Sequence, residues 1–295
     1  MTTTLPMALS VTGTTKHYNS GFTLDDITFD LPAGYIMGLI GPNGAGKSTL
    51  IKLILNMIRR DAGRIQVLGL DAVGYEEAVK EQLGVVFDTS YFVDTWSVNK
   101  VERVMRGMYR TWHADLFDGY LRRFGLDRGK KVKELSRGMQ MKLMLAVALS
   151  HDARLLILDE PTSGLDVLAR DELMDILAAY IEDGERSVLF STHITADLER
   201  AADFITYITR GELYFTGPKD EFEDSFRIVK AGLDLLDRLP AKACVGMHRY
   251  STGFDALVRT ENLPLWPADQ IVVEPASIDD IIRLTNVGRP SPEEV

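Results

Sequence analysis

Strand and helix patterns alternate along the first two thirds of the chain. Leu24 to Leu31 alternates between apolar and polar residues, which predicts a half-buried strand, and residues 35–40 form an apolar run typical of a fully buried strand. Apolar side chains from Leu50 to Ile58 cover most of a helix circumference, which predicts a helix buried against a sheet. The apolar runs Leu155 to Leu158 and Ser187 to Ser191 predict two more strands, with helices between them. This order is typical of a parallel sheet covered on both faces.

The pattern changes twice outside that core. Between about Ser97 and Gly138 the spacing is helical and rich in charged residues, which predicts a mostly helical insertion. Past about Pro218 we expect a strand at 226–229, a helix at 233–239, a hairpin around 251–253 and a final helix. The final helix is predicted from Ser277 and Asp280, whose spacing resembles a capping box. We therefore expect a main domain over residues 1–220, with a helical subdomain at about 89–150, and an accessory domain over residues 221–295.

A glycine-rich stretch lies directly between the apolar strand and the buried helix. It consists of Gly41, Pro42, Asn43, Gly44, Ala45, Gly46, Lys47, Ser48 and Thr49. This spacing matches the phosphate-binding P-loop, in which backbone N–H groups and the helix N-terminus surround phosphate oxygens. We expect Lys47 to contact the β and γ phosphates, Ser48 to bind Mg²⁺ and Thr49 to add a hydrogen bond.

Two adjacent carboxylates end the apolar run that begins at Leu155. Asp159 and Glu160 lie where open α/β sheets place their ligand sites. A strand that ends in two acidic residues is common at solvated edges, but the P-loop makes a catalytic interpretation the stronger one. Asp159 suits Mg²⁺, and Glu160 suits polarisation of an attacking water.

Together these patterns predict an α/β fold with a P-loop NTPase core. The core has a mostly parallel sheet with a helical subdomain inserted into it. A small α/β accessory domain follows at the C-terminus.

The motifs occur, across roughly Leu9 to Gly217, in the order found in ATP-binding cassette (ABC) ATPases, and the chain resembles that family. The resemblance implies an antiparallel β region on the N-terminal side of the sheet. It implies that ATP and Mg²⁺ are the cofactors. It also implies that Tyr18 places its ring against adenine, although a partly buried core aromatic is the alternative interpretation of that residue.

Three further segments take their expected roles from this resemblance. Residues 135–140 resemble the signature motif, with Ser136 and Gly138 matching and Arg137 and Met139 departing from its commonest form, and in the family this helix start contacts the γ-phosphate held by the opposite subunit. Residues 163–166 resemble the loop through which two subunits communicate. His193 resembles the switch histidine that contacts the γ-phosphate and the attacking water.

One position departs from the common family pattern. Asp88 stands where many members carry a glutamine that reaches Mg²⁺. Aspartate can still bind the cation, but it is shorter and charged, and cannot donate a hydrogen bond when ionised. Together with the altered signature and the C-terminal appendage, this variant resembles bacterial subunits that pair with exporter permeases of the ABC-2 class.

Aromatic residues are dense after Asp88. They are Tyr91, Phe92, Trp96, Tyr109 and Trp112. In the family this region receives the permease's cytoplasmic helices, and aromatic side chains suit such anchoring contacts. Core packing is the alternative for each of them.

Composition indicates which partners and which location the protein has. The chain has 295 residues and a formal net charge of −10. Because this negative charge disfavours binding to the phosphate backbone of nucleic acids, we expect no nucleic-acid partner. Its single cysteine, Cys244, cannot form an internal disulfide, so we expect the protein to work in a reducing compartment. We also expect the Cys244 side chain to be buried. No signal peptide or membrane-spanning run is evident, which predicts a cytoplasmic protein held at the inner face of the membrane by a separate transmembrane permease.

The function predicted from these observations is an ATP-hydrolysing transport subunit. Two subunits, in a homodimer or a heterodimer with a related ATPase, are expected to close around two MgATP molecules and drive the permease, with export as the direction. One alternative is an ABC-type ATPase that works on ribosomes or DNA. The other is a regulatory subunit that binds ATP with little hydrolysis.

Overall fold

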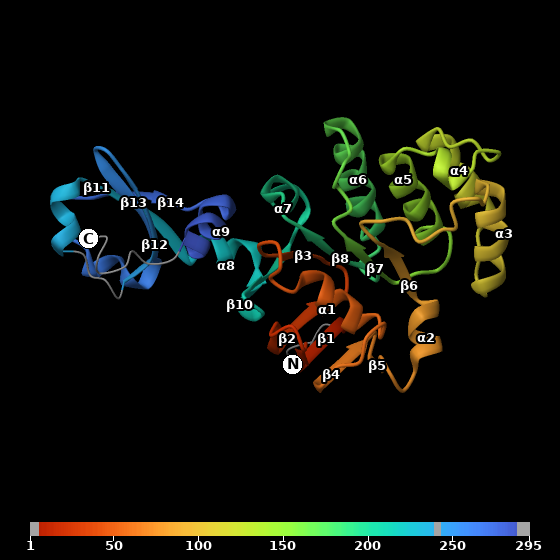
Figure 1. The fold of residues 1–295 in the computed structure, drawn as a ribbon, viewed down its shortest axis with the longest axis horizontal. Coiled ribbons are helices and arrows are strands. Elements are labelled where there is room, and N and C mark those ends of the chain that lie inside the picture. The colour runs from red at the N-terminus through yellow and green to blue at the C-terminus, as the bar shows by residue number, and fades with distance from the viewer. Residues whose placement is uncertain (1–5, 239–242, 288–295) are drawn as a thin grey trace. The chain divides into compact units, whose positions relative to one another are not determined.

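The computed structural model describes residues 6–238 and 243–287. The chain divides into two compact units, Met1–Tyr214 and Phe215–Val295. Each is described below by itself, and Figure 1 labels their helices and strands.

A ten-stranded sheet forms the centre of the first unit among the described residues. Its order is β5 (Leu70–Asp71), β4 (Ala62–Val67), β1 (Met7–His17), β2 (Thr23–Pro32), β10 (Glu212–Pro218), β9 (Phe204–Thr209), β3 (Ile36–Ile40), β8 (Ser187–Thr192), β7 (Leu155–Asp159) and β6 (Leu83–Val86). The strands from β9 to β6 pair in parallel, whereas β1 pairs antiparallel with both β2 and β4. The sheet therefore combines a parallel core with an antiparallel region built mainly from the N-terminal segment.

The burial of each strand explains its sequence pattern. Every residue of β3, β7 and β8 is buried, because helices cover both faces of the parallel part. In β2 the predicted alternation is confirmed, since Leu24, Ile27, Phe29 and Leu31 are buried and the residues between them are mostly exposed.

Helices α1 (Lys47–Ile54) and α2 (Glu76–Glu81) interrupt the strands, and α3 (Val98–Met108), α4 (Ala114–Phe124) and α5 (Arg137–Ala148) form the helical region between β6 and β7. Figure 1 shows these last three helices grouped next to one another, and α5 packs against both α4 and β6. Helices α6 (Val167–Tyr180) and α7 (Thr195–Ala201) follow β7 and β8. Ser97, Ser136 and Asp166 cap α3, α5 and α6 through their side chains, which explains where those helices begin.

Helix α1 is shorter than the apolar pattern predicts. It ends at Ile54, and Asn56 adopts a left-handed conformation with φ of 52°. The Met57 N–H donates to the Lys52 carbonyl and the Asn56 N–H to the Leu53 carbonyl, which is the Schellman termination. The prediction of a helix to Ile58 was therefore wrong by about one turn.

The second unit is built on a four-stranded antiparallel sheet. Its order is β12 (Cys244–Tyr250), β13 (Gly253–Arg259), β11 (Phe226–Ala231) and β14 (Val272–Pro275), with α8 (Lys219–Asp224), α9 (Ile278–Val287) and the short 3₁₀ helices η2 (Leu233–Arg238) and η3 (Thr260–Leu265). The chain order and strand order match a split βαβ arrangement. Phe254 and Val229 pack with Trp266 in one part of its core, and Cys244 is buried there as expected.

Sequence expectations for this unit are largely confirmed. The β12–β13 hairpin turns at Ser251 and Thr252, and Ser277 and Asp280 hydrogen-bond reciprocally at the start of α9 as a capping box. The helix predicted at 233–239 is a 3₁₀ helix that ends at Arg238, and Leu239 lies outside the described residues.

The expected fold class is confirmed: a large mixed sheet with helices, and a smaller antiparallel sheet toward the C-terminus. Within the described ranges, no helix is both long enough and apolar enough to cross a lipid bilayer.

Candidate functional site

A cleft lies at the carboxyl edge of the parallel strands. Strands β3, β8, β7 and β6 are neighbours and parallel, so the residues that follow them meet at one edge. The cleft has a volume of about 580 Å³, within the range of ligand pockets. It is lined by Phe22, Pro42, Asn43, Gly44, Ala45, Gly46, Lys47, Ser48, Thr49, Asp88, Arg137, Glu160, Ser163 and His193. The structure thus brings together most of the P-loop with three candidate residues from β6, β7 and β8.

Two P-loop glycines are required by their surroundings. A Cβ atom on Gly41 would lie 2.1 Å from the Ile208 carbonyl oxygen, and one on Gly46 would lie 2.7 Å from the Leu24 side chain. Gly46 also has φ of 114°, a conformation that other residues rarely adopt. The loop can therefore lead into α1 in this conformation only if positions 41 and 46 are glycine.

Lys47 is held inside the cleft. Its ammonium donates to the Gly41 carbonyl at 2.8 Å and lies 3.6 Å from Oε1 of Glu160, and the residue is 7% exposed. A buried ammonium needs such partners, because an unpaired charge in the interior is costly. Lys47 is thus already directed toward the space in front of the P-loop.

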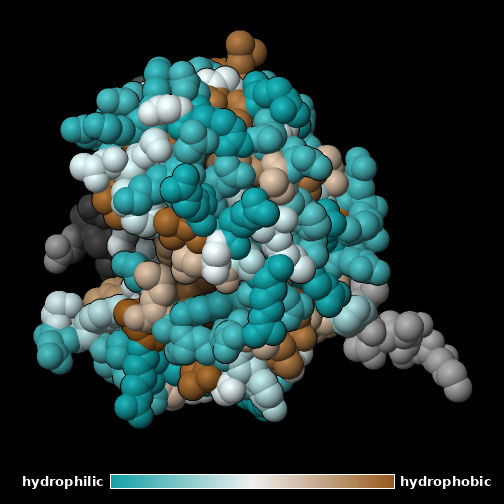
Figure 2. All heavy atoms as spheres, turned by 90° about the vertical axis from the view of Figure 1, so that its right-hand side faces the viewer, coloured by the Kyte–Doolittle hydropathy of each residue, from teal (hydrophilic) through white to brown (hydrophobic). Residues whose placement is uncertain are grey.

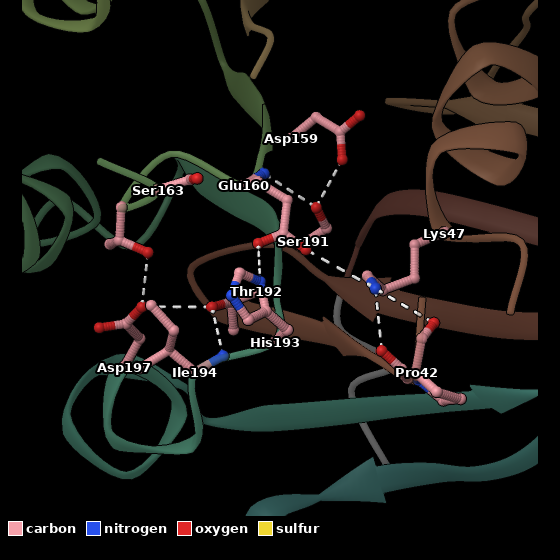
Figure 3. Close-up of polar contacts among 12 residues, drawn as sticks. Pro42, Lys47, Asp159, Glu160, Ser163, Ser191, Thr192, His193, Ile194 and Asp197 are labelled. Carbon is pink, nitrogen blue, oxygen red and sulfur yellow. Dashed lines mark hydrogen bonds and ion pairs between the residues drawn. The ribbon is translucent and has the colours of Figure 1, made fainter. Parts of the chain in front are cut away.

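Glu160 is fixed between several polar groups, as Figure 3 shows. Its backbone has φ of 51°, in the left-handed region, and its N–H donates to Oγ of Ser191 at 2.9 Å. Nδ1 of His193 lies 2.5 Å from its Oε2. The same Ser191 hydroxyl donates to Oδ1 of Asp159 at 2.6 Å. Ser191, in β8, therefore helps to position both acidic residues at the end of the neighbouring strand β7.

Asp197 braces the two loops that carry the cleft residues (Figure 3). It is 2% exposed, and its Oδ2 accepts hydrogen bonds from Thr162 at 2.7 Å and Thr192 at 3.2 Å. Arg170 lies 3.8 Å from its other oxygen. These contacts tie the segment after β7 to the segment after β8, so Asp197 holds Glu160 and His193 in register.

Replacing Asp197 with alanine is expected to destabilise the fold by about 2–4 kcal/mol, because two buried hydroxyls lose their acceptor and Arg170 loses its ion-pair partner. Urea unfolding of the full chain measures this change. Asp175→Ala on α6 is the control, since that carboxylate is mostly exposed and pairs with Arg200 at the surface. Equal urea midpoints for the Asp197 and Asp175 variants would show that Asp197 does not stabilise the two loops.

Five expected site residues do not line this cleft. Gly41 and Asp159 each directly precede, in the sequence, a residue that does line it. Ser136 caps the start of α5 by accepting from the Met139 N–H at 3.3 Å, and Gly138 lies in the first turn of that helix. Tyr18 is 38% exposed and contacts Phe22.

The sequence prediction missed Phe22 and gave Arg137 no site role. Phe22 lies near Gly46 and lines the cleft. Arg137 donates to the Ser163 hydroxyl at 3.2 Å, which joins the start of α5 to the loop after β7. The one available signal was the position of Phe22, four residues after Tyr18 in a short loop between two strands.

Sequence comparison gives several related proteins. Residues 24–163 match the family model described as ABC transporter. The chain is 34% identical over 211 residues to the Nod factor export ATP-binding protein I of Rhizobium leguminosarum bv. viciae, covering 70% of this chain and 68% of that protein. It is 32% identical over 235 residues to the daunorubicin/doxorubicin resistance ATP-binding protein DrrA of Streptomyces peucetius, covering 76% and 69%.

Solved structures agree with this similarity. A structure described as an ATP binding subunit of an ABC transporter aligns with a TM-score of 0.67 at 27% identity, over 73% of this chain and 92% of that one. The ATP-binding cassette MJ0796, solved as a dimer bound to ADP and Pi, aligns with a TM-score of 0.65 at 21% identity, over 71% and 98%, which speaks for the fold alone. Given the P-loop cleft and these relatives, the chain belongs to the ABC transporter family and is one of its ATP-binding subunits, an ABC ATPase.

Proposed function

We propose that this chain hydrolyses MgATP as one of two subunits that close around two nucleotides and thereby drive a separate transmembrane exporter. The observation that carries the proposal is the convergence of Lys47, Glu160 and His193 in one cleft beside the P-loop. In this proposal residues 1–220 form the nucleotide-binding domain and 221–295 an accessory domain.

The contacts of Glu160 suggest how hydrolysis is prepared. Its two oxygens face Lys47 and His193. A triphosphate in the P-loop would attract the Lys47 ammonium, because phosphate carries more negative charge than a single carboxylate. Glu160 is then released from Lys47 and orients the attacking water, taking its proton. His193, still next to Glu160, stabilises charge on the terminal phosphate.

The donor set fits Mg²⁺. Ser48 and Asp88 line the cleft, and oxygen ligands are those that Mg²⁺ prefers. Asp159 is 5% exposed, and no described cation lies within ion-pair distance of it, so its buried charge lacks a counterion that Mg²⁺ would provide. The described residues contain no group of three His, Cys, Asp or Glu that could hold a metal by itself, which fits a cation that arrives with phosphates. Ser48, Asp159 and Asp88 would hold it, and it would neutralise charge on the phosphates.

Ser136 and Gly138 support a dimeric site. They open α5 at a capped N-terminus, a suitable donor for an anion, yet they do not line the cleft of their own chain. A second subunit facing the cleft would supply the same helix start to the phosphates. The family resemblance implies this arrangement.

The ring of Tyr18 and its neighbour Phe22 would hold the adenine. Their ring centroids are 6.3 Å apart, and Phe22 reaches the P-loop side of the cleft. We propose that the base stacks on Tyr18 while Phe22 limits its position, since every nucleobase has a face that can stack on an aromatic ring.

Export is proposed because the names of the relatives refer to Nod factor export and to drug resistance. The chain would then lie at the inner face of the membrane through its permease. A groove of about 400 Å³ is a suitable docking surface for a cytoplasmic helix of that permease. Its apolar lining comprises Leu55, Met57, Leu83, Val85, Phe87, Tyr91, Met105, Met108 and Tyr109.

Figure 2 shows the side of the molecule that carries α2 and α3. Hydrophilic side chains cover most of it, and apolar side chains gather in a recess near its middle. Tyr91 is 44% exposed and packs its ring against Phe87, whereas Phe92 is 6% exposed. The aromatic group predicted to dock is thus divided: Tyr91 and Tyr109 line the groove, and Phe92 belongs to the core.

Replacing Tyr91 and Met108 with alanine is expected to abolish co-purification with the permease, because both side chains are exposed and apolar at the groove. ATP hydrolysis by the isolated chain should stay unchanged. The control carries Leu116→Ala and Tyr250→Ala, two exposed apolar side chains outside the groove. Undiminished co-purification of the groove variant would contradict docking there.

The dimeric motor itself is tested by ATP hydrolysis at increasing protein concentration, with Mg²⁺ present or withheld. A rate per subunit that rises with concentration and requires Mg²⁺ is expected for a homodimer. A chain that binds ATP but stays inactive at every concentration would contradict the homodimer and favour a heterodimer or a regulatory subunit.

A further inference from the structure

The helical region of the first unit differs in charge from the rest of the chain. Residues 89–150 contain twelve Lys and Arg against six Asp and Glu, within a chain whose net charge is −10. Ten of these twelve cations are exposed, and six of the ten lie on α3 or on the segment beside its start. These six are here called the basic stripe: Lys100, Arg103, Arg106, Lys130, Lys131 and Lys133.

Helix geometry and loop pairing bring the stripe together. Lys100, Arg103 and Arg106 are three residues apart on α3, so they share one face of it, opposite the buried Val98, Val101 and Met105. The segment with the three lysines runs beside the start of α3. The Val98 N–H donates to the Lys130 carbonyl, and the Val132 N–H donates to the Trp96 carbonyl.

These cations have no acidic partner inside the described part of the chain. The Lys131 backbone N–H donates to the Glu134 carboxylate, but no described carboxylate lies within 4.0 Å of a side-chain nitrogen of the stripe. Arg128 in the same loop, by contrast, pairs with Glu102 and Asp118. The stripe therefore contributes positive charge that internal ion pairs do not neutralise. Such a concentration on an acidic protein favours an external anionic partner.

The surroundings favour a lipid surface as that partner. The Lys100 ammonium lies 5.1 Å from the ring centroid of Trp96, and Met108 at the other end of α3 is 67% exposed. Cations flanked by tryptophan and an apolar side chain are typical of segments at the membrane interface. Helix α3 also contributes Met105 and Met108 to the groove proposed for the permease, which would bring this helix toward the bilayer.

We propose that the basic stripe binds anionic lipid headgroups of the inner leaflet. The stripe would orient the ATPase beneath its permease, with the net acidic remainder of the chain repelled from the same surface. The inference rests on the proposed transport function for its location, but the binding itself requires neither nucleotide nor permease.

The test is sedimentation of the full chain, without ATP, with vesicles of phosphatidylcholine alone or mixed with phosphatidylglycerol. We expect binding only to the mixed vesicles, and its loss in high salt, because Coulombic attraction to exposed charges is screened. The variant Lys100→Gln, Arg103→Gln, Arg106→Gln should bind those vesicles at least about tenfold more weakly, since each basic residue near an anionic surface contributes. A second variant carries Lys130→Gln, Lys131→Gln and Lys133→Gln and should also bind more weakly. It keeps the proposal testable if the first variant misfolds.

A matched control removes the same charge elsewhere: Arg122→Gln, Arg154→Gln, Arg186→Gln, all at exposed positions. Equal weakening by the control, or equal binding to both kinds of vesicle, would overturn the proposal. If vesicle binding is absent but the stripe variants lose the permease, the partner is an acidic protein segment and the lipid assignment is wrong. ATP binding by the same variants is measured separately, and its retention separates a failure of the stripe from a failure of the proposed ATPase function.

Discussion

Glu160→Gln is expected to lower ATP hydrolysis by at least about a hundredfold while ATP binding persists. The amide keeps the size of the side chain but cannot take a proton from water. Its backbone anchors, the N–H contacts to Ser191, do not involve the side chain and should survive. The variant should therefore accumulate with ATP bound and, in the proposed mechanism, as a closed dimer.

Hydrolysis of ATP and the elution volume on size exclusion, with and without MgATP, measure both parts of this expectation. Glu182→Gln, an exposed change near the end of α6, is the control and should behave as the parent chain does. Hydrolysis at the parental rate would exclude Glu160 as the base. Loss of hydrolysis without an ATP-dependent dimer would leave the base role in place and contradict the dimer.

Lys47→Gln is expected to weaken MgATP binding by about 3 kcal/mol, roughly a hundredfold, because charge-assisted hydrogen bonds to the phosphates are lost. The substitution also removes the cation that lies 3.6 Å from Glu160 in the structure. Equilibrium binding of a fluorescent ATP analogue with Mg²⁺ measures the change.

Lys52→Gln is the matched control, since it removes an exposed ammonium from the same helix. Thermal unfolding of both variants shows whether the loss of the buried Lys47 charge alters the fold. Parental affinity in a folded Lys47→Gln variant would mean that Lys47 does not contact the phosphates.

Local patterns predicted much of the fold. The fully apolar runs at β3, β7 and β8 could be recognised because a strand covered on both faces must be apolar throughout. Ser277 and Asp280 revealed the start of α9, since a capping box requires only neighbouring residues. The end of α1 was missed because a left-handed asparagine at position 56 is not specified by hydrophobic spacing.

By itself the sequence determined the P-loop and the carboxylates at a strand end, because each is a short contiguous pattern next to a recognisable strand. Only the tertiary structure decided which residues share the cleft. Ser191 meets Asp159 across 32 positions, and Asp197 meets Thr162 across 35, through pairing and packing of separate elements. The structure likewise showed that Tyr91 is exposed whereas its neighbour Phe92 is buried. It also showed that Ser136 does not line the cleft of its own chain. Such distinctions depend on contacts between distant segments, which form only when the sheet brings the ends of its parallel strands together.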